Sequence, residues 1–408
     1  MAVWGTTIAA GLAVGPILAG ALVAAFGWRS VYVLLVALTL LTLAVGWFGI
    51  EESRGAGKRV DWAGLVVFAA ALGALIFALV HGASAGFSSP LIVVVLAAAV
   101  LGLVGFCVLE WRERDPMLEI ALFRRPAFTG AALAALASAM ANFGLKFYML
   151  IYLLRFRGDS PVLAGVQFLP ITGVSLVVSP LSGRLMTRVA PRILMASSLA
   201  LIGVGDLLLH GISASTSYAS LLPGFVLVGI GAGAINPPLG QTAVGVVARA
   251  QAGMASGVNN TFRQLGTALG IAVFGAVSLT VVSRHFAGTP LAGDHGVLGL
   301  VASGNLHGAA AAAPASARGV VAALASPAFL AGLNAALLGI AAVAFAGALL
   351  AAVLVRSRDF VVEQGADGGP PHPVGVAHAH GNAAACGLHA GVDVIPTATS
   401  ARSPLRGS

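Results

Sequence analysis

Long apolar stretches recur along this chain, and shorter segments that carry most of the arginines separate them. About ten stretches reach the roughly 17–25 residues that a helix needs to cross the hydrocarbon core of a bilayer. The predicted spans are Val3–Phe26, Ser30–Ile50, Trp62–Val80, Pro90–Leu109, Ala127–Leu154, Pro161–Met186, Leu194–Ile212, Leu221–Val244, Gly253–Val281 and Phe329–Val355. The pattern therefore predicts an all-α polytopic membrane protein that is embedded in the lipid bilayer.

Composition supports the same class of protein. Of the 408 residues, 58% are hydrophobic and 9% are charged, whereas a typical soluble domain carries roughly 25% charged residues. The mean hydropathy is +0.97. The net charge of +8 comes with arginines clustered between the apolar stretches. Such a distribution sets membrane orientation, so it gives no reason to expect nucleic-acid binding.

Lysines and arginines favour alternate loops. The richest loop carries Arg112, Arg114, Arg124 and Arg125, and the loop between the second and third spans carries Arg54, Lys58 and Arg59. Cytoplasmic loops carry the excess of positive side chains in membrane proteins. We therefore expect a multi-pass protein of the cell membrane with both termini in the cytoplasm.

The sequence offers little for cofactor chemistry. Its two cysteines, Cys107 and Cys386, make neither a disulfide framework nor a zinc site. No Gly-x-x-x-x-Gly-Lys-Ser/Thr loop is present, which argues against an ATP-driven pump. Four tail histidines leave weak metal binding open, although a compositionally biased end is the favoured interpretation: His372, His378, His380 and His389. We expect no cofactor, no metal and no catalytic residue.

The first apolar stretch carries Gly11, Gly15, Pro16 and Gly20, with Ala19 before the last glycine. Glycines at this spacing leave part of one helix surface without side chains, so that another backbone can approach closely. Pro16 removes a backbone donor and favours a bend near Gly15. A tight packing face alone would explain these residues. The stretch also resembles the antiporter signature of the major facilitator superfamily, Gly-x-x-x-Gly-Pro-x-x-Gly-Gly, which lies on that family's fifth helix.

Three later stretches strengthen the resemblance. Segment 183–192 is similar to the C-terminal copy of the family's loop motif, Gly-x-x-x-Asp-Arg-x-Gly-x-Arg. Thr187 stands where that motif has aspartate, and Ala190 where it has glycine, which puts in doubt the charge relay that this aspartate anchors in the family. Segments 157–170 and 263–273 resemble the entry to the family's tenth helix and its thirteenth helix. The candidate residues of the loop motif are Gly183, Arg184, Arg188 and Arg192.

These motifs, in this order, resemble those of the fourteen-spanning drug/proton antiporter branch. The resemblance implies a major facilitator-like helical bundle, active as a monomer, that exports amphiphilic and often cationic drugs or metabolites against inward proton flow. It also implies that about four N-terminal helices are missing, so that the chain is N-terminally truncated. One alternative is a non-transporting remnant of such a transporter. A remoter alternative is a polytopic membrane enzyme, which would need clustered acidic or histidine residues that this sequence lacks.

The expected organisation follows from the spans. Residues 1–110 would form the remainder of the N-terminal bundle plus two linker helices, and 111–126 a cytoplasmic linker. Residues 127–355 would form the C-terminal bundle, which includes a flexible external loop at 286–326 rich in Ala and Gly. Residues 356–408, rich in Gly, Pro, Ala and His, would form a disordered cytoplasmic tail.

Ionisable side chains inside predicted spans are functional candidates, because each costs about 2.5–3.5 kcal/mol at the bilayer centre on insertion scales. Asp206 lies among Leu, Ile, Val and Gly, and His210 follows one turn later on the same predicted face. Lys146 lies in an earlier span and is the natural partner for Asp206. We expect a proton-coupling role for these three residues; the alternative is an ion pair that only aids packing.

Uncharged polar residues and one arginine complete the candidate site. We expect them to line or gate a central cavity: Asn142, Gln167, Asn236, Gln241 and Arg263. The alternative, hydrogen bonding between neighbouring helices, is about equally compatible with the amides. Arg263 fits a gate or packing role on the cytoplasmic side better than substrate contact.

Overall fold

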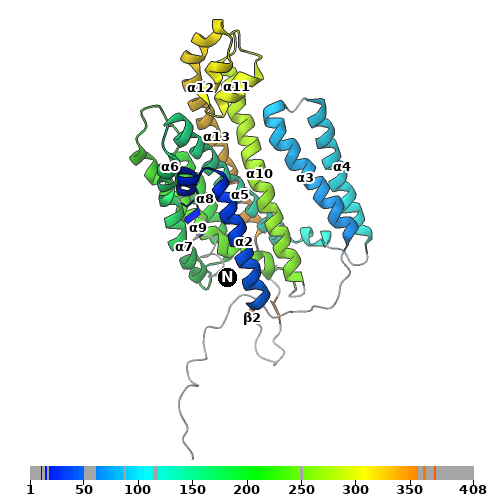
Figure 1. Cartoon of the computed structure of the whole chain (residues 1–408). Coiled ribbons are helices and arrows are strands. Elements are labelled where there is room, and N and C mark those ends of the chain that lie inside the picture. The colour runs from blue at the N-terminus through cyan, green and yellow to red at the C-terminus, as the bar shows by residue number, and fades with distance from the viewer. Residues whose placement is uncertain are drawn as a thin grey trace, which may run out of the picture. The chain divides into compact units, whose positions relative to one another are not determined.

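The computed structural model describes residues 11, 14–15, 18–49, 61–86, 89–113, 118–248, 251–356, 362–363 and 372–373. Within these residues, nine helical segments are long and apolar enough to cross a membrane. They match nine of the predicted spans in order, and Figure 1 labels the helices and colours them along the chain. Of the first predicted span, residues 11, 14–15 and 18–26 are described and helical; we call this segment the N-terminal helix.

Three apolar helices follow it: α2 (Arg29–Gly49), α3 (Trp62–Ala85) and α4 (Pro90–Arg112). The short η1 (Ile120–Arg124) leads into α5 (Pro126–Ile151), which the π-helical η2 (Tyr152–Phe156) extends. The next span is divided into α6 (Pro161–Gln167) and α7 (Leu169–Leu185). After them come α8 (Pro191–Leu208), α9 (Tyr218–Gly245) and α10 (Ala252–His285).

The start of α6 follows from local chemistry. Ser160 Oγ accepts a hydrogen bond from the backbone N–H of Leu163 at 3.2 Å, which satisfies one of the free donors of the first turn. Pro161 occupies the first helical position, where its missing N–H costs nothing. The helix thus begins where the predicted span Pro161–Met186 begins.

Small residues let the helices of the C-terminal bundle approach closely. A Cβ on Gly231 of α9 would clash with Ser198 O of α8, and a Cβ on Gly205 of α8 would lie 2.9 Å from Gly224 O of α9. Lipid tails offer no hydrophobic drive for helix association, so close backbone packing of this kind supplies much of the attraction. The interface between α8 and α9 is therefore tightly closed.

Serine hydroxyls join α7 to α9. Ser175 Oγ donates to Gly229 O at 2.8 Å, and Ser182 Oγ donates to Ala234 O at 2.7 Å. Hydrogen bonds between membrane helices are worth about 0.6 kcal/mol each on average. These two bonds fix the register of α7 on α9, and they add little to the stability of the contact between the two helices.

Helices α3 and α4 pair with each other, and α3 also contacts α10. The Phe68 and Phe106 rings lie 4.8 Å apart between centroids, and Ala71 packs against Gly102. Many large apolar side chains of α2 and α4 are exposed. Exposed apolar surface of this kind on backbone-satisfied helices suits contact with lipid.

The segment 286–326 differs from the expected loose loop. It contains α11 (His295–Ala302), α12 (Leu306–Ala312), η4 (Ala315–Ala317) and the first part of α13 (Arg318–Leu354), which begins well before the predicted Phe329. Helices α11 and α12 contact each other and α13 (Figure 1).

Two N-caps and a small buried apolar face explain why this segment forms helices. Asp294 Oδ1 accepts from the Val297 N–H, and Asn305 Oδ1 from the Gly308 N–H, both at 3.0 Å. Val297, Leu298 and Val301 are buried. Helices α11 and α12 have only 8 and 7 residues, which is too short for hydrophobic periodicity to show in the sequence.

Beyond α13, the strand β1 (Val362–Glu363) pairs antiparallel with β2 (His372–Pro373). The other residues after Arg356 lie outside the described residues, so the expected disordered tail stays a prediction. The proposed division at residues 110, 126 and 355 also stays a prediction.

Candidate functional site

Four of the predicted site residues line one small polar cavity among α5, α7, α9 and α10. They are Asn142 and Lys146 of α5, Asn236 of α9 and Arg263 of α10, and the cavity volume is ≈ 230 Å³. The remaining lining residues are mostly small or hydroxylated: Ser138, Ala139, Phe143, Thr172, Ser175, Ala232, Gly233 and Ile235. We call this space the polar cavity.

A larger apolar cavity of ≈ 610 Å³ adjoins it. The two share Phe143, Lys146 and Thr172 in their walls. The rest of its wall comes from the N-terminal helix, α5, η2, α6, α10 and the junction of α6 with α7: Gly11, Gly15, Ala19, Gly20, Val23, Phe147, Leu150, Leu154, Pro161, Gly165, Phe168 and Ile271. We call this space the apolar cavity.

The glycines of the stretch that resembles the antiporter signature, Gly11, Gly15 and Gly20, all line the apolar cavity; we call them the glycine motif. Gly20 is buried, and a Cβ there would lie 2.8 Å from Pro161 O at the start of α6. Gly11 and Gly15 also line the cavity, and a Cβ on either would have no other atom within 4 Å. Pro16 lies outside the described residues, so the predicted bend stays a prediction. The close approach expected of this stretch occurs at Gly20.

Lys146 stands at the boundary between the two cavities. Its side chain is partly buried, and its Nζ lies 5.6 Å from the centroid of the Phe143 ring. No Asp or Glu is among the described residues that line either cavity. The ammonium therefore has an aromatic ring, but no carboxylate, as a neighbour within this part of the structure.

The two amides in the polar cavity are bound to their own helices. Asn142 Nδ2 donates to Ser138 O at 3.2 Å, and Asn236 Nδ2 donates to Ala232 O at 3.0 Å. Asn142 is 7% exposed, and its buried Oδ1 has no hydrogen-bond partner among the described residues. A buried acceptor without a partner costs free energy, so this oxygen is suited to a ligand or water in the cavity.

Arg263 connects the polar cavity to a third one. This third cavity, of ≈ 580 Å³, lies where α9 ends and α10 begins, and we call it the helix-end cavity. It is lined by Gly240, Ala243, Val244, Ser256, Gly257, Asn259, Asn260 and Arg263. The position of Arg263 between two cavities is compatible with the predicted gate.

Asp206 is separate from these cavities. It is fully buried in α8, and neither carboxyl oxygen has a hydrogen-bond partner among the described residues. Its neighbour Gly205 packs on α9, and Gly203 packs on Phe345 of α13. The natural pairing with Lys146 is not formed in this structure, because Lys146 faces the cavities while Asp206 is enclosed by helices.

His210 does not share the environment of Asp206, contrary to the expected common face. Helix α8 ends at Leu208, and His210 lies in the turn that follows, where it is exposed. The predicted spacing requires a helix that continues to Ile212. Gly211 has a φ of 91°, a conformation that ends a helix and is readily adopted by glycine.

The other two amides lie elsewhere. Gln167 Nε2 donates to Asp159 Oδ2 at 3.2 Å, and that carboxylate also pairs with Arg157 Nε at 3.2 Å. Gln167 therefore supports the turn before α6, and it is not among the residues that line the polar or apolar cavity. Gln241 lies in α9 and is partly buried, next to Gly240 of the helix-end cavity.

The loop motif lies between α7 and α8. Gly183 and Arg184 are in the last turn of α7, Arg188 is in the connecting turn and Arg192 is in the first turn of α8; the three arginines are exposed. Thr187 Oγ1 donates to Arg184 O at 2.9 Å. The residue at the motif's aspartate position thus caps the end of α7 through a neutral hydrogen bond.

Sequence reasoning missed the hydroxyl residues of the polar cavity. Ser138, Thr172 and Ser175 line it, and each is a small residue in an apolar span, which is common at ordinary helix contacts.

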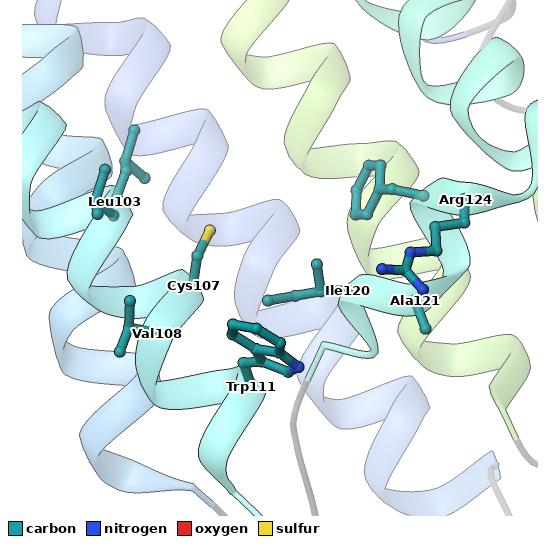
Figure 2. A pocket seen from close by; sticks show the side chains of 9 residues that line it. Leu103, Cys107, Val108, Trp111, Ile120, Ala121 and Arg124 are labelled. Carbon is teal, nitrogen blue, oxygen red and sulfur yellow. The ribbon is translucent and has the colours of Figure 1, made fainter.

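A further cavity of ≈ 620 Å³ lies between α4 and η1, where Cys107, Trp111, Ile120 and Arg124 are among its lining residues (Figure 2). None of the predicted site residues lies there.

Several curated proteins are similar to this chain. The multidrug resistance protein Stp of Mycobacterium tuberculosis (strain CDC 1551 / Oshkosh) is 32% identical over 276 residues, which cover 67% of this chain and 51% of that protein. The methylenomycin A resistance protein of Streptomyces coelicolor is 30% identical over 277 residues, 68% of this chain and 58% of the relative. The puromycin resistance protein pur8 of Streptomyces alboniger is 31% identical over 312 residues, which cover 75% of this chain and 61% of that protein. The chain spans about half the length of the first of these curated relatives.

A solved structure is also similar, a bacterial homolog of the human lysosomal transporter Spinster in an inward-facing, occupied conformation. It has a TM-score of 0.47 and 17% sequence identity, and the match covers 72% of this chain and 67% of that one. The family model of the Major Facilitator Superfamily matches residues 58–271, more than half of the chain. The chain is therefore a multi-pass membrane protein that belongs to the Major Facilitator Superfamily.

Proposed function

We propose that this chain acts as a secondary transporter that exports amphiphilic small molecules in exchange for protons, by alternating access. The observation that carries the proposal is the pair of adjoining cavities, one apolar and one polar, that share Lys146 and Thr172 in their walls. An amphiphile needs both environments. Substrate sites in transporters of this kind lie between helical bundles near the bilayer midplane.

The cavity dimensions fit this use. Ligand pockets typically enclose about 300–1,000 Å³, lined mainly by apolar and aromatic side chains with a few polar groups. The apolar cavity of ≈ 610 Å³ includes Phe143, Phe147 and Phe168, and the adjoining ≈ 230 Å³ supplies the polar groups. The names of the relatives, which are resistance proteins for multiple drugs, methylenomycin A and puromycin, support export of small molecules.

The glycine motif has a mechanical role in this proposal. Gly20 allows the N-terminal helix to lie so close to the start of α6 that a Cβ at this position would be 2.8 Å from Pro161 O. Contact of backbone on backbone closes one side of the apolar cavity without side chains that would have to rearrange. We propose that this contact opens and closes as the transporter changes between its two states.

Proton coupling is assigned to Asp206. Its carboxyl group is buried inside a membrane span with no hydrogen-bond partner among the described residues, and an ionised carboxylate in such a place would be very unfavourable. The present conformation therefore suits a protonated Asp206. Release of the proton would require water to reach α8 in the other conformation, which is the behaviour that an antiporter needs.

The experiment is transport by the 408-residue chain in inside-out membrane vesicles, with a panel of neutral and charged fluorescent amphiphiles. We expect accumulation of at least one probe that a proton gradient drives and a protonophore abolishes. Accumulation that persists with the protonophore would contradict proton coupling. Absence of any accumulation by correctly inserted protein would contradict the proposal and favour the non-transporting alternative.

A further inference from the structure

We propose that the joined cavities select amphiphilic anions: an acidic headgroup, such as a carboxylate, held by Lys146 and Arg263 in the polar cavity, with its apolar body in the apolar cavity. This inference rests on the proposed function only in taking the cavities as the substrate site. It assigns a negative charge to the substrate, whereas the resemblance to drug antiporters would favour cationic substrates.

The charged side chains that line these cavities are all positive. The charged residues that line the polar cavity are Lys146 and Arg263. Lys146 is the charged residue of the apolar cavity, and Arg263 that of the helix-end cavity. No acidic side chain is among the described residues lining any of the three spaces. A cationic ligand would meet like charges with no carboxylate to offset them, and this costs more in a low-dielectric interior than in water.

Lys146 lacks a counter-charge among the described residues. Its Nζ lies 5.6 Å from the Phe143 ring centroid, and it forms no ion pair among the described residues. A cation inside a membrane protein is usually paired, because transfer of an unpaired charge out of water is unfavourable. An anionic headgroup would supply the missing counter-charge, so the attraction would be realised only when substrate is bound.

The unpartnered oxygen of Asn142 sets a second requirement on the ligand, a hydrogen-bond donor, which is independent of the ligand's charge. This side chain is 7% exposed, lines the polar cavity and has a buried Oδ1 without a partner among the described residues. Asn142 lies one helical turn before Lys146, so both line the same side of the cavity. A hydroxyl or N–H next to the acidic group of the ligand would satisfy this acceptor.

The arrangement also orients the ligand. Lys146 lines both the polar and the apolar cavity, so its ammonium marks the point where headgroup and body join. The polar cavity, of ≈ 230 Å³, has room for a headgroup but not for a large drug-like body. Arg263 lines the polar and helix-end cavities. An anion entering from the ends of α9 and α10 would therefore meet Arg263 before Lys146.

The test is binding of three probes of one shape to the purified 408-residue chain in nanodiscs of zwitterionic lipid, followed by calorimetry. The probes are 2-naphthoate, the neutral 2-naphthamide and the cationic 2-(aminomethyl)naphthalene. We expect naphthoate to bind roughly tenfold more tightly than the cation, because Lys146 and Arg263 attract a carboxylate and repel an ammonium group. Naphthoate that binds no more tightly than the cation, or does not bind, would overturn the inference.

Variants separate charge from shape. Lys146→Gln should weaken naphthoate about tenfold and leave naphthamide unchanged, whereas Lys146→Arg should keep most of the preference for the anion. Arg284→Gln, at an exposed arginine in the last turn of α10, is the matched control and should change nothing. If Lys146→Gln does not purify as folded protein, Arg263→Gln replaces it, with the same expected loss of preference. Equal weakening of all three probes would show a packing role and contradict the inference.

This measurement involves no transport and no proton gradient, so the two proposals fail separately. Anion-selective binding without export in vesicles would contradict the proposed transport function and leave the inference of anion selectivity intact. Export of neutral or cationic amphiphiles, with no preference for naphthoate in binding, would sink the inference alone.

Discussion

The surroundings of Lys146 and Asp206 show two ways in which one helical bundle holds an ionisable side chain inside a membrane. Lys146 lies on the wall shared by two cavities, where a ligand can reach it. Asp206 is fully buried in α8, in a region where glycines bring α8 and α9 into backbone contact. The accessible charge suits recognition of a substrate, and the enclosed one suits storage of a proton. A direct ion pair would have made one site serve both purposes.

The largest effect is expected at Asp206. Asp206→Asn keeps the shape of the side chain but cannot gain or lose a proton, so proton-coupled export should be abolished while the protein still inserts and purifies. The measurement is substrate-evoked proton movement across vesicle membranes, read with a pH-sensitive dye. The control is Asp159→Asn, which removes the carboxylate paired with Arg157 before α6. Unchanged coupling in Asp206→Asn would reject the assignment.

The tight packing near Asp206 gives the next largest effect. A methyl group on Gly231 would clash with the backbone of Ser198, so we expect Gly231→Ala to lower the free energy of unfolding by about 1–3 kcal/mol. Gly173 of α7 has no atom within 4 Å of its Cβ position. Gly173→Ala should therefore leave stability unchanged or raise it by up to about 1 kcal/mol. Thermal unfolding in detergent distinguishes the two; similar melting temperatures would show that α8 and α9 are not tightly closed.

The apolar cavity gives a smaller effect, on rate more than on stability. Gly20→Ala places a methyl group 2.8 Å from Pro161 O, so the N-terminal helix must shift and the export rate should fall several-fold. Gly73→Ala, in α3, meets no atom within 4 Å and lies outside the residues that line the apolar and polar cavities, so this variant should export at a nearly unchanged rate. Initial rates of probe uptake into vesicles provide the comparison. Equal losses in both variants would mean that close approach at Gly20 has no special role.

The smallest effect is expected in the loop motif, between α7 and α8. Thr187→Asp restores the motif's acidic residue beside three exposed arginines, and exposed ion pairs contribute about 0–1 kcal/mol. The melting temperature should change by no more than a few degrees, and any gain should disappear at high salt. A large stabilisation that persists at high salt would show that the motif is more buried than its exposure indicates.

The spans could be predicted from the sequence, because a helix must be apolar over its full length to cross a bilayer. Nine of them match the helices of the described residues in order. The short helices of segment 286–326 could not be predicted from the sequence. Helices α11 and α12 are too short to show hydrophobic periodicity, and they depend on the N-caps at Asp294 and Asn305.

The candidate site could be predicted in part. Asn142, Lys146, Asn236 and Arg263 come together in one cavity, because polar residues in apolar spans tend to face the interior of a bundle. Which of them meet across helices is decided by rotation and register, and the sequence does not encode these in a readable way. For this reason the sequence alone does not decide whether Lys146 pairs with Asp206, and it suggests a cavity position for Gln167, which instead binds Asp159.

The most direct test of the separation between the two charges is the affinity of 2-naphthoate for the Asp206→Asn variant in nanodiscs. The separate location of Asp206 predicts an affinity within about twofold of the unsubstituted chain, even though coupled export is lost, whereas Lys146→Gln should weaken binding about tenfold. Loss of naphthoate affinity in Asp206→Asn as large as that in Lys146→Gln would contradict the account, because it would place the carboxyl group and the ammonium in a single site.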